Sequence, residues 1–239
     1  MSPQNEDRHA RSRLLFGEEG LARIQSAEIL LLGLGGVGGA AFEALVRAGV
    51  GQIHLVDGDC FTESNLNRQI LASEASLGRP KVELAVERAR AIGGETQLSS
   101  YEMKVTAENA GDFLKSLKMR PDALVIDCID DIPAKVSLLQ ELIPTEHRLI
   151  CSGGAGNRLL ASGIRYAYLE DAFSDPLLKT LRRRLGSYPK KRIYTAFSPH
   201  APLKIEGGTI ASSPYLPNVM GFSLAGLAIG LITRQKGLL

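Results

Sequence analysis

The sequence is short of aromatic residues, cysteine and net charge. Tryptophan is absent, and aromatic residues make up 5% of the 239 residues. The three cysteines, Cys60, Cys128 and Cys151, include no Cys-x-x-Cys pair, which excludes a four-cysteine zinc site. The 28 Lys and Arg residues nearly balance the 26 Asp and Glu residues, so the net charge of +2 does not by itself indicate a nucleic-acid-binding protein. The odd number of thiols and the polar N-terminus favour a reducing, cytoplasmic location.

A long hydrophobic run is also missing. The most apolar late segment, Val219–Thr233, is interrupted by glycine and is shorter than the about 20 apolar residues that a membrane-spanning helix needs. We therefore predict a buried helix and no stable membrane span, with a peripheral membrane contact as the alternative. The proportions of 44% hydrophobic and 23% charged residues are typical of a folded globular protein and exclude a disordered or collagen-like chain.

Glycine is in excess, with 25 residues, and short apolar runs alternate with amphipathic segments. Such alternation is typical of β-α-β units around a parallel sheet. We predict an α/β fold with a Rossmann-like, doubly wound, mostly parallel sheet, extended by antiparallel strands and followed by a C-terminal helix. One domain is expected over residues 1–239, with a nucleotide-binding half at about 27–152 and a substrate-side half at about 153–239. The expected strands are Glu28–Leu34, Gln52–Asp57, Thr96–Lys104, Ala123–Cys128, Arg148–Ser152, Gly163–Leu169 and Arg192–Phe197, and the expected helices are Val37–Ala48, Pro80–Ala91, Ala107–Leu117, Ala134–Leu142, Asp175–Leu185 and Val219–Thr233.

A glycine-rich turn, Gly33-Leu34-Gly35-Gly36-Val37-Gly38-Gly39, follows the first expected strand. Glycines here allow a tight turn and let backbone N–H groups reach a phosphate at the N-terminus of the next helix. Asp57 ends the second expected strand, where a carboxylate can bind a ribose hydroxyl. These residues predict a nucleotide site for NAD(P) or ATP, and a glycine turn without a ligand is the structural alternative.

The residues beyond Asp57 favour ATP. Asp59, Arg68 and Lys81 follow it, and a later strand ends in the acidic run Asp127-Cys128-Ile129-Asp130-Asp131. Because the carboxyl ends of parallel strands share one edge of a sheet, we expect these cations and carboxylates to converge on one crevice. Cations neutralise phosphate charge and a carboxylate holds Mg²⁺, whereas hydride transfer needs neither. The sequence therefore predicts a site for ATP and Mg²⁺.

Five separated elements occur in the order found in one known family. They are an N-terminal arginine segment, the glycine turn, the run from Asp57 to Gln69, the lysine of Gly-Arg-Pro-Lys and the acidic strand end. Over roughly residues 11–160 the chain resembles the ubiquitin-activating-enzyme-like adenylyltransferases, the ThiF, MoeB and HesA group. The resemblance implies that Asp130, Arg68 and Lys81 act in catalysis and that Asp130 holds Mg²⁺ with ATP. It also implies a homodimer in which Arg11 or Arg13 reaches the ATP of the partner subunit. The nucleotide-binding residues that it implies are Gly33, Gly35, Gly36, Asp57, Asp59, Ser64, Asn65, Asn67, Arg68, Lys81, Asp130, Asp131, Arg11 and Arg13.

The second half resembles the TcdA (CsdL) branch of that family, the tRNA threonylcarbamoyladenosine dehydratases. The resemblance rests on the Ser152–Gly156 turn, the Asp175-Pro-Leu run and the segment Gly-Thr-Ile-Ala-Ser-Ser-Pro-Tyr. It implies an enzyme that uses ATP to adenylate the carboxylate of threonylcarbamoyladenosine in tRNA, after which the side chain cyclises with loss of water. One departure is His200, which stands where the branch usually has glutamate. Two alternatives stay open: adenylation of a ubiquitin-like or sulfur-carrier protein, disfavoured by the missing Cys-x-x-Cys pair, and a non-catalytic nucleotide-binding or NAD(P)-dependent protein.

A basic segment in the second half is a candidate tRNA contact. The alternative is a solvated helix face. By resemblance a sulfur-transfer protein is a further possible partner. None of the three cysteines is expected to be catalytic, and His200 is expected to be a polar loop residue. The cations of the basic segment are Lys179, Arg182, Arg183, Arg184, Lys190, Lys191 and Arg192.

Overall fold

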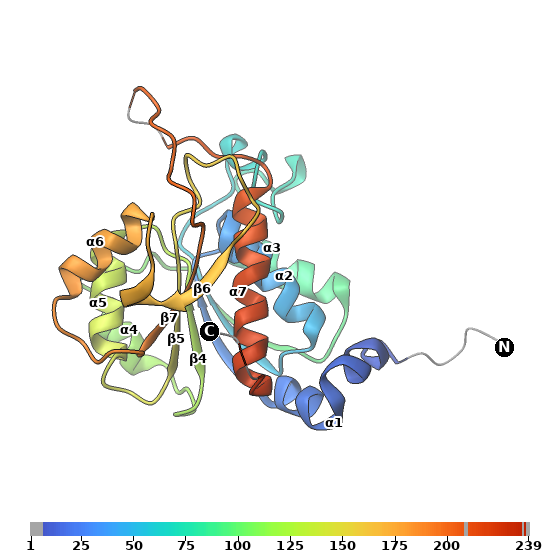
Figure 1. The fold of residues 1–239 in the computed structure, drawn as a ribbon. Coiled ribbons are helices and arrows are strands. Elements are labelled where there is room, and N and C mark those ends of the chain that lie inside the picture. Colours follow the sequence, from blue (N-terminus) through green and yellow to red (C-terminus); the bar gives the residue numbers. More distant parts are fainter. Residues whose placement is uncertain (1–6, 208–209, 236, 238–239) are drawn as a thin grey trace.

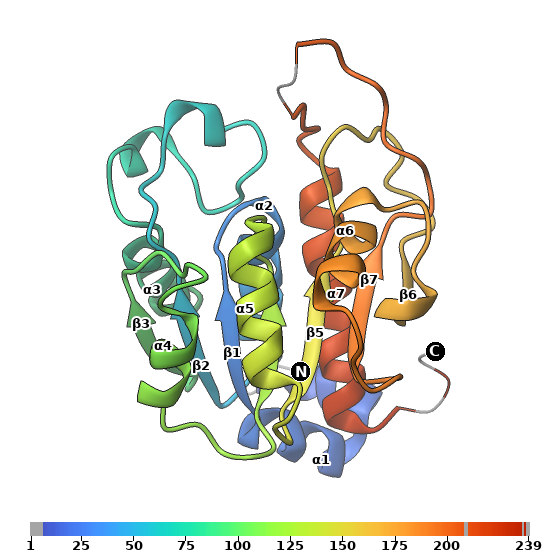
Figure 2. The ribbon, with the colours of Figure 1, turned by 90° about the vertical axis from the view of Figure 1, so that its left-hand side faces the viewer.

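The structure is a computed structural model that describes residues 7–207, 210–235 and 237. Seven strands form one sheet in the order β3-β2-β1-β4-β5-β7-β6, with helices on both faces (Figure 1, Figure 2). The strands are β1 (Glu28–Leu32), β2 (Gln52–Val56), β3 (Gln97–Tyr101), β4 (Leu124–Asp127), β5 (Arg148–Ser152), β6 (Arg165–Tyr168) and β7 (Ile193–Phe197). The helices are α1 (Ala10–Ser26), α2 (Gly36–Ala48), α3 (Lys81–Ile92), α4 (Ala110–Ser116), α5 (Ile132–Leu142), α6 (Pro176–Leu185) and α7 (Leu216–Thr233), and 3-10 turns lie at Glu63–Asn65, Glu74–Ser76 and Leu169–Asp171.

The inner strands of the sheet are buried on both faces, which explains why β1 is an unbroken apolar run rather than an alternating one. Ile29 and Leu31 belong to the core under α2, α3 and α7, whereas Leu30 and Leu32 belong to the core under α4, α5 and α6. Figure 2 shows α4, α5 and α6 together in front of the sheet, with α1 below its amino-terminal edge. The strand order reverses between β1 and β4, so a crevice is expected where their carboxyl ends part.

Helix α7 packs along α2 and confirms the prediction of a buried C-terminal helix (Figure 1). A Cβ on Gly221 would lie 2.1 Å from the carbonyl oxygen of Val37, so only glycine allows this close approach. The start of α7 also reaches the glycine-rich turn, because a Cβ on Gly36 would lie 2.8 Å from the Cβ of Pro217. Within the described residues, α7 is the one helix long and apolar enough to cross a membrane, and 56% of it is buried inside the protein.

Two features differ from the sequence-based expectation. Helix α1 was not predicted, because its many charged residues leave only a weak apolar stripe. Its buried apolar side chains, Leu21 and Ile24, both lie in the part that follows Gly17. The antiparallel extension is confirmed for β6 against β7, but β7 itself runs parallel to β5. The chain between β5 and β7 is long enough for the crossover that a parallel pair requires. The remaining predicted elements are present, and most ends shift by a few residues.

Candidate functional site

The glycine-rich turn lies between β1 and α2, at the edge where β1, β2 and β4 end. Gly33 has a φ of +86°, a conformation that favours glycine, and its N–H donates to the carbonyl of Val56 at 2.8 Å. A Cβ on Gly38 would lie 1.8 Å from the carbonyl oxygen of Gly33, so the turn itself requires this glycine. A Cβ on Gly35, the N-cap of α2, would meet no described atom within 4 Å. The N-terminus of α2 therefore borders open space and can bind an anion.

Asp57, directly after β2, holds this turn in place. Its Oδ2 accepts a hydrogen bond from the N–H of Leu34 at 2.6 Å, and its Oδ1 accepts one from the N–H of Asp59 at 2.8 Å. Burial raises the pKa of Asp57 above its ordinary value, although these hydrogen bonds and the ammonium of Lys81 oppose the rise. The carboxylate that the sequence assigned to a ribose hydroxyl thus also ties the glycine turn to β2.

Lys81 is the first residue of α3 and is buried. Its Nζ lies 3.0 Å from Oδ2 of Asp59 and 4.0 Å from Oδ1 of Asp57. The N–H of Lys81 also donates to the carbonyl of Asp59 at 3.0 Å, which fixes the start of α3 against the loop. The structure therefore brings the predicted residues Asp57, Asp59 and Lys81 together, with the ammonium held between two carboxylates.

The loop that carries Ser64, Asn65, Asn67 and Arg68 joins β2 to α3. Nη1 of Arg68 donates to the carbonyl of Ser64 at 2.7 Å and to Oδ1 of Asn67 at 2.8 Å. A Cβ on Gly36 would lie 3.6 Å from Cγ of Arg68, so this side chain lies over the start of α2. Oδ1 of Asn65 accepts a backbone hydrogen bond within the loop at 3.1 Å. Arg68 thus meets the glycine turn, while Asn65 shapes the loop.

The acidic strand end after β4 contains carboxylates with different surroundings. Asp130 is exposed and makes no hydrogen bond or ion pair with another described residue. Asp131 caps α5, because its Oδ1 accepts a hydrogen bond from the N–H of Ala134 at 2.8 Å. A Cβ on Gly33 would lie 3.1 Å from the carbonyl of Cys128, which places this strand end against the glycine turn. Asp130 therefore directly follows the backbone that packs against the glycine turn, and Asp131 has a structural role that the sequence pattern did not reveal.

A buried ion pair supports this strand end. Nζ of the fully buried Lys135 lies 2.9 Å from Oδ2 of Asp127 and donates to the Asp127 carbonyl at 3.2 Å. Burial alone would lower the pKa of Lys135, but the Asp127 carboxylate together with the nearby Cys151 and Cys128 raises that pKa overall. Oδ1 of Asp127 accepts a hydrogen bond from the N–H of Ile129 at 3.0 Å, so the pair shapes the backbone that leads to Asp130. The sequence analysis did not identify Lys135. The one sign of its role in the sequence is that it shares the helical spacing of the buried apolar residues of α5.

The glycine cluster after β5 packs against the protein itself. A Cβ on Gly153 would lie 2.8 Å from both Oδ2 of Asp175 and Cβ of Phe197. A Cβ on Gly156 would lie 2.2 Å from Cγ2 of Ile210. Gly153 is therefore required by internal packing, whereas the exposed side chain of Ile210 can turn away from a Cβ at position 156.

The predicted arginines of the N-terminal segment lie away from the crevice of their own chain. Helix α1 begins beside the C-terminal end of α2, because a Cβ on Gly49 would lie 2.6 Å from the ring of His9. That position is at the amino-terminal edge of the sheet, opposite the glycine turn (Figure 2). Arg13 pairs with Asp7 at 2.6 Å, and Arg11 is exposed. Within one chain the structure does not bring Arg11 and Arg13 to the other predicted site residues.

The predicted basic segment is divided in the structure. The guanidinium of Arg192 donates to four backbone carbonyls at and after the end of α5, at 2.7–3.0 Å. Arg182 donates to the carbonyls of Leu169 and Ala172. Both guanidiniums are thus committed to the fold, which corrects the expectation that they face tRNA. The cations that remain exposed are Lys179, Arg183, Arg184, Lys190 and Lys191.

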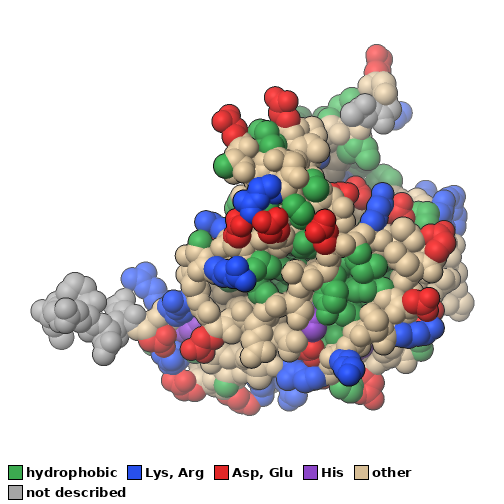
Figure 3. Space-filling model, turned by 180° about the vertical axis from the view of Figure 1, so that it is seen from behind, with side chains coloured by type: hydrophobic (Ala, Val, Ile, Leu, Met, Phe, Trp, Pro, Cys, Tyr) green, Lys and Arg blue, Asp and Glu red, His purple; other side chains and the backbone are tan. Residues whose placement is uncertain are grey.

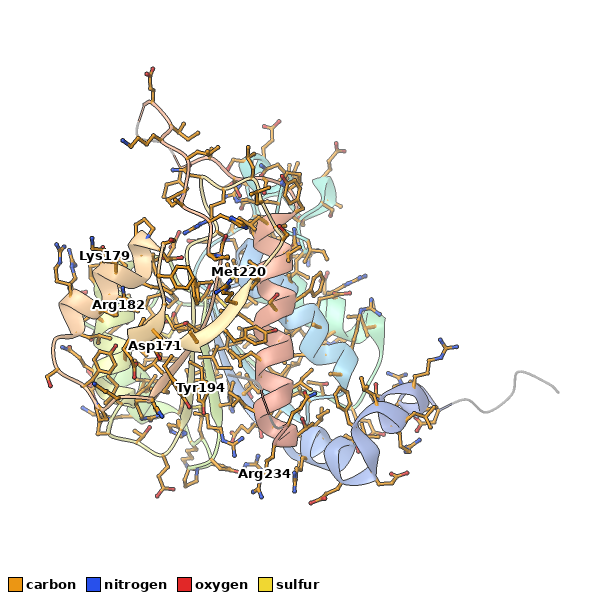
Figure 4. The ribbon with its side chains drawn as sticks, viewed as in Figure 1. Asp171, Lys179, Arg182, Tyr194, Met220 and Arg234 are labelled. Carbon is orange, nitrogen blue, oxygen red and sulfur yellow. The ribbon has the colours of Figure 1, made fainter. Side chains whose placement is uncertain are left out.

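Helix α6 presents the exposed cations on the side of the sheet away from α7. Figure 4 shows Lys179 and Arg182 projecting from α6, while Met220 lies in α7. On the side of the molecule that Figure 3 shows, acidic and basic side chains are interspersed around an apolar area.

The cysteines and His200 lie outside any catalytic arrangement within the described residues. Burial raises the pKa of Cys151 to about 12 and that of Cys128 further, so neither is a thiolate nucleophile at neutral pH. Cys60 is exposed. Nε2 of His200 lies 3.2 Å from the carbonyl oxygen of Ser162, which joins two loops at the substrate-side end of the sheet.

Comparisons with known proteins agree with this geometry. The model of the ThiF family matches residues 7–161. The tRNA threonylcarbamoyladenosine dehydratase of Bacillus subtilis is 35% identical over 198 residues, which cover 82% of this chain and 76% of that protein. The protein of the same name from Escherichia coli is 35% identical over 173 residues, 72% of this chain and 63% of that one. A crystal structure of E. coli TcdA in complex with ATP matches with a TM-score of 0.86 at 30% identity, over 95% of this chain and 94% of that one.

The family model spans the glycine turn, the Arg68 loop, Lys81 and Asp130, and the fold match extends over the substrate-side half. The agreement therefore covers both the crevice and the elements that follow it. The chain belongs to the ThiF family and, within that family, to the tRNA threonylcarbamoyladenosine dehydratases.

Proposed function

We propose that this protein uses ATP to adenylate the carboxylate of threonylcarbamoyladenosine in tRNA and then closes that side chain into a ring. The observation that carries the proposal is the arrangement around the N-terminus of α2. Arg68 lies over this helix end, Lys81 is held by Asp57 and Asp59, and Asp130 follows the Cys128–Ile129 backbone that packs against Gly33. Two cations and a free carboxylate around a helix N-terminus suit a triphosphate.

The chemistry solves one problem, which is that a carboxylate is a poor electrophile. A carboxylate oxygen attacks the α-phosphorus of ATP, the α–β phosphoanhydride bond breaks, and pyrophosphate leaves. A nitrogen of the same side chain then attacks the acyl carbon, the bond to AMP breaks, and the ring closes. The net change is loss of one water from the nucleoside as ATP becomes AMP and pyrophosphate. Because the nucleophile is intramolecular, proximity lowers the barrier of the second step.

This chain's residues act mainly on the first step. We infer that the backbone N–H groups of α2, Arg68 and Lys81 bind the phosphates and stabilise the charge that develops on them. Mg²⁺ in nucleotide sites is held by one or two carboxylates with phosphates and water, and it neutralises phosphate charge there. The described residues contain no preformed group of three metal-binding side chains, so the exposed Asp130 fits such a shared ion. The high pKa values of Cys128 and Cys151 agree with a route that needs no enzyme thiol.

The homodimer is part of the proposal. Arg11 is the better candidate for a contribution to the partner's site, because Arg13 is paired with Asp7. Leu14 and Leu15 beside it are 88% and 76% exposed, which suits a surface that another chain covers. A mixture of Arg11→Ala and Asp130→Ala subunits should recover activity that neither variant has alone. Without recovery on mixing, Arg11 does not act on the partner's site.

The tRNA contact is proposed for the exposed cations of α6 and the loop after it rather than for Arg182 and Arg192. A cytoplasmic location and a sulfur-transfer partner stay predictions from the sequence. A fractionation and a pull-down from cell extract, respectively, test them.

One assay tests the reaction and its rival. The protein is incubated with ATP, Mg²⁺ and threonylcarbamoyl-modified tRNA, and the digested nucleosides are weighed by mass spectrometry. A nucleoside lighter by one water, formed together with AMP, supports the proposal. An unchanged nucleoside, together with pyrophosphate exchange on a sulfur-carrier protein, would assign the chain to the rival adenylation.

A further inference from the structure

A buried ion pair lies on the substrate side, outside the nucleotide crevice. Nη2 of Arg158 lies 3.3 Å from Oδ2 of Asp175, and the two side chains are 1% and 0% exposed. The desolvation penalty of a buried ion pair is so large that two apolar side chains of similar size often stabilise a fold equally well. Its presence therefore calls for an explanation in terms of what it orients.

Asp175 joins two segments with one carboxylate. Its Oδ1 accepts a hydrogen bond from the N–H of Leu178 at 3.0 Å and so caps α6. Its Oδ2 accepts a hydrogen bond from the N–H of Gly154 at 2.9 Å. Gly153 is pressed against the same oxygen, because a Cβ there would lie 2.8 Å away. The position of the Gly153–Gly154 backbone is therefore set by the first turn of α6.

Arg158 completes the connection from the other side. Its Nε donates to the carbonyl of Gly154 at 3.0 Å, its Nη2 to that of Ser174 at 3.1 Å, and its Nη1 to that of Ser198 at 3.4 Å. Burial lowers the pKa of Arg158, and only the Asp175 carboxylate opposes this. The rigid fork of a guanidinium can hold three carbonyls in fixed directions, which a lysine cannot do.

The two ends of this connection face different parts of the proposed reaction. Helix α6 carries the exposed Lys179, Arg183 and Arg184, the proposed tRNA contact. The Gly153–Gly154 backbone directly follows β5, which pairs with β4, the strand that leads to Asp130. The α6 end of this connection thus lies at the proposed tRNA-binding surface of the protein, and the Gly153–Gly154 end follows a strand that neighbours β4.

We propose that Arg158 and Asp175 are positioning residues that couple the placement of α6 to the Gly153–Gly154 backbone and so align the tRNA-borne acyl group with ATP. The inference rests on the proposed function. It assigns neither residue a contact with reacting atoms. Under this proposal the position of the Gly153–Gly154 backbone depends on tRNA binding at α6, whereas ATP binding does not.

Two variants test the coupling. Asp175→Asn keeps the one acceptor that caps α6, but it puts an NH2 donor in place of the oxygen that binds Gly154 and Arg158. Arg158→Lys keeps the charge but removes the fork. We expect each to lower kcat/KM for modified tRNA by about 10- to 100-fold, the effect of a misplacement of about 1 Å, with KM for ATP changed less than about twofold. Glu43→Gln is the matched control, because Glu43 is a buried carboxylate bound by Arg47 and Arg88 between α2 and α3. Equal losses for tRNA and ATP, or an equal loss in the control, would overturn the proposal.

A measurement on the unaltered protein avoids any effect on folding. Hydrogen exchange at the Gly154 amide is followed with and without tRNA that lacks the threonylcarbamoyl group, so that no acyl group enters the crevice. We expect tRNA to slow this exchange severalfold, because loading α6 tightens the Gly154–Asp175 hydrogen bond. If tRNA binds and the exchange is unchanged, the coupling is wrong. If tRNA does not bind at all, the proposed function fails first.

Discussion

Replacing Lys135 with methionine leaves the Asp127 carboxylate buried without its partner. The chain length of the side chain is nearly kept, so the main loss is the charge. Removing one member of a buried ion pair costs about 3–5 kcal/mol of the free energy of unfolding. At about 2–4 °C per kcal/mol for a chain of this size, the midpoint of thermal unfolding should fall by roughly 6–20 °C.

The loss should depend on pH. Burial raises the pKa of Asp127 above its ordinary value even with Lys135 present, and the variant removes the charge that opposes this rise. A carboxyl group whose pKa is higher in the folded than in the unfolded state favours folding while protonated, and that contribution is lost as pH rises through the folded pKa. The deficit of Lys135→Met should therefore be smaller in mild acid than in mild base.

Urea unfolding followed by circular dichroism measures this at about pH 5.5 and about pH 8.5. The double variant Asp127→Asn/Lys135→Met is the control, because it removes both charges and should regain most of the lost stability. A deficit under about 1 kcal/mol, or one equal at both pH values, would refute the assignment of this pair as a charged, buried support.

Three further predictions concern the crevice and the fold around it. Asp130→Ala should lower kcat about 10²- to 10³-fold with stability unchanged. Asp131→Ala should keep most activity but cost about 1 kcal/mol of stability, because α5 loses its cap. The conversion assay and thermal melting separate the two variants. Gly35→Ala should fold normally but weaken ATP binding measured by calorimetry, while Gly38→Ala should fail to fold, because its Cβ would overlap a carbonyl oxygen. Arg192→Met should lower the melting temperature without raising KM for tRNA, and a raised KM with normal melting would contradict its structural role.

The nucleotide side of the site could be predicted because its signals are local. The glycine turn and Asp57 follow apolar strands directly, and the ends of parallel strands meet at one edge whatever the loops do. Asp130 follows β4 near the same edge, and Lys81, at the start of α3, is brought to Asp57 and Asp59 by the intervening loop.

The substrate side and the buried or unpatterned supports of the fold could not be predicted in the same way. Arg158 and Lys135 stand alone among apolar or small neighbours in the sequence, where a single charge is usually solvated. Arg182 and Arg192 bind carbonyls supplied by other segments of the fold, so their sequence neighbours give no sign that they are occupied. Helix α1 lacks a clear apolar period because only its second part is buried.

The contact between α7 and the glycine turn has a consequence for the order in which the protein is made. Pro217 packs on Gly36, and Nδ2 of Asn218 donates to the carbonyl of Arg68 at 3.0 Å. These contacts join α7 to a turn translated much earlier, so the nucleotide site is completed only after α7 has left the ribosome. We expect stalled chains that end before Leu216 to expose α2 to protease and to be unprotected by ATP, and early protection would show that α7 is dispensable for the site. Nucleotide binding thus reports whether α7 has reached its place against the glycine turn.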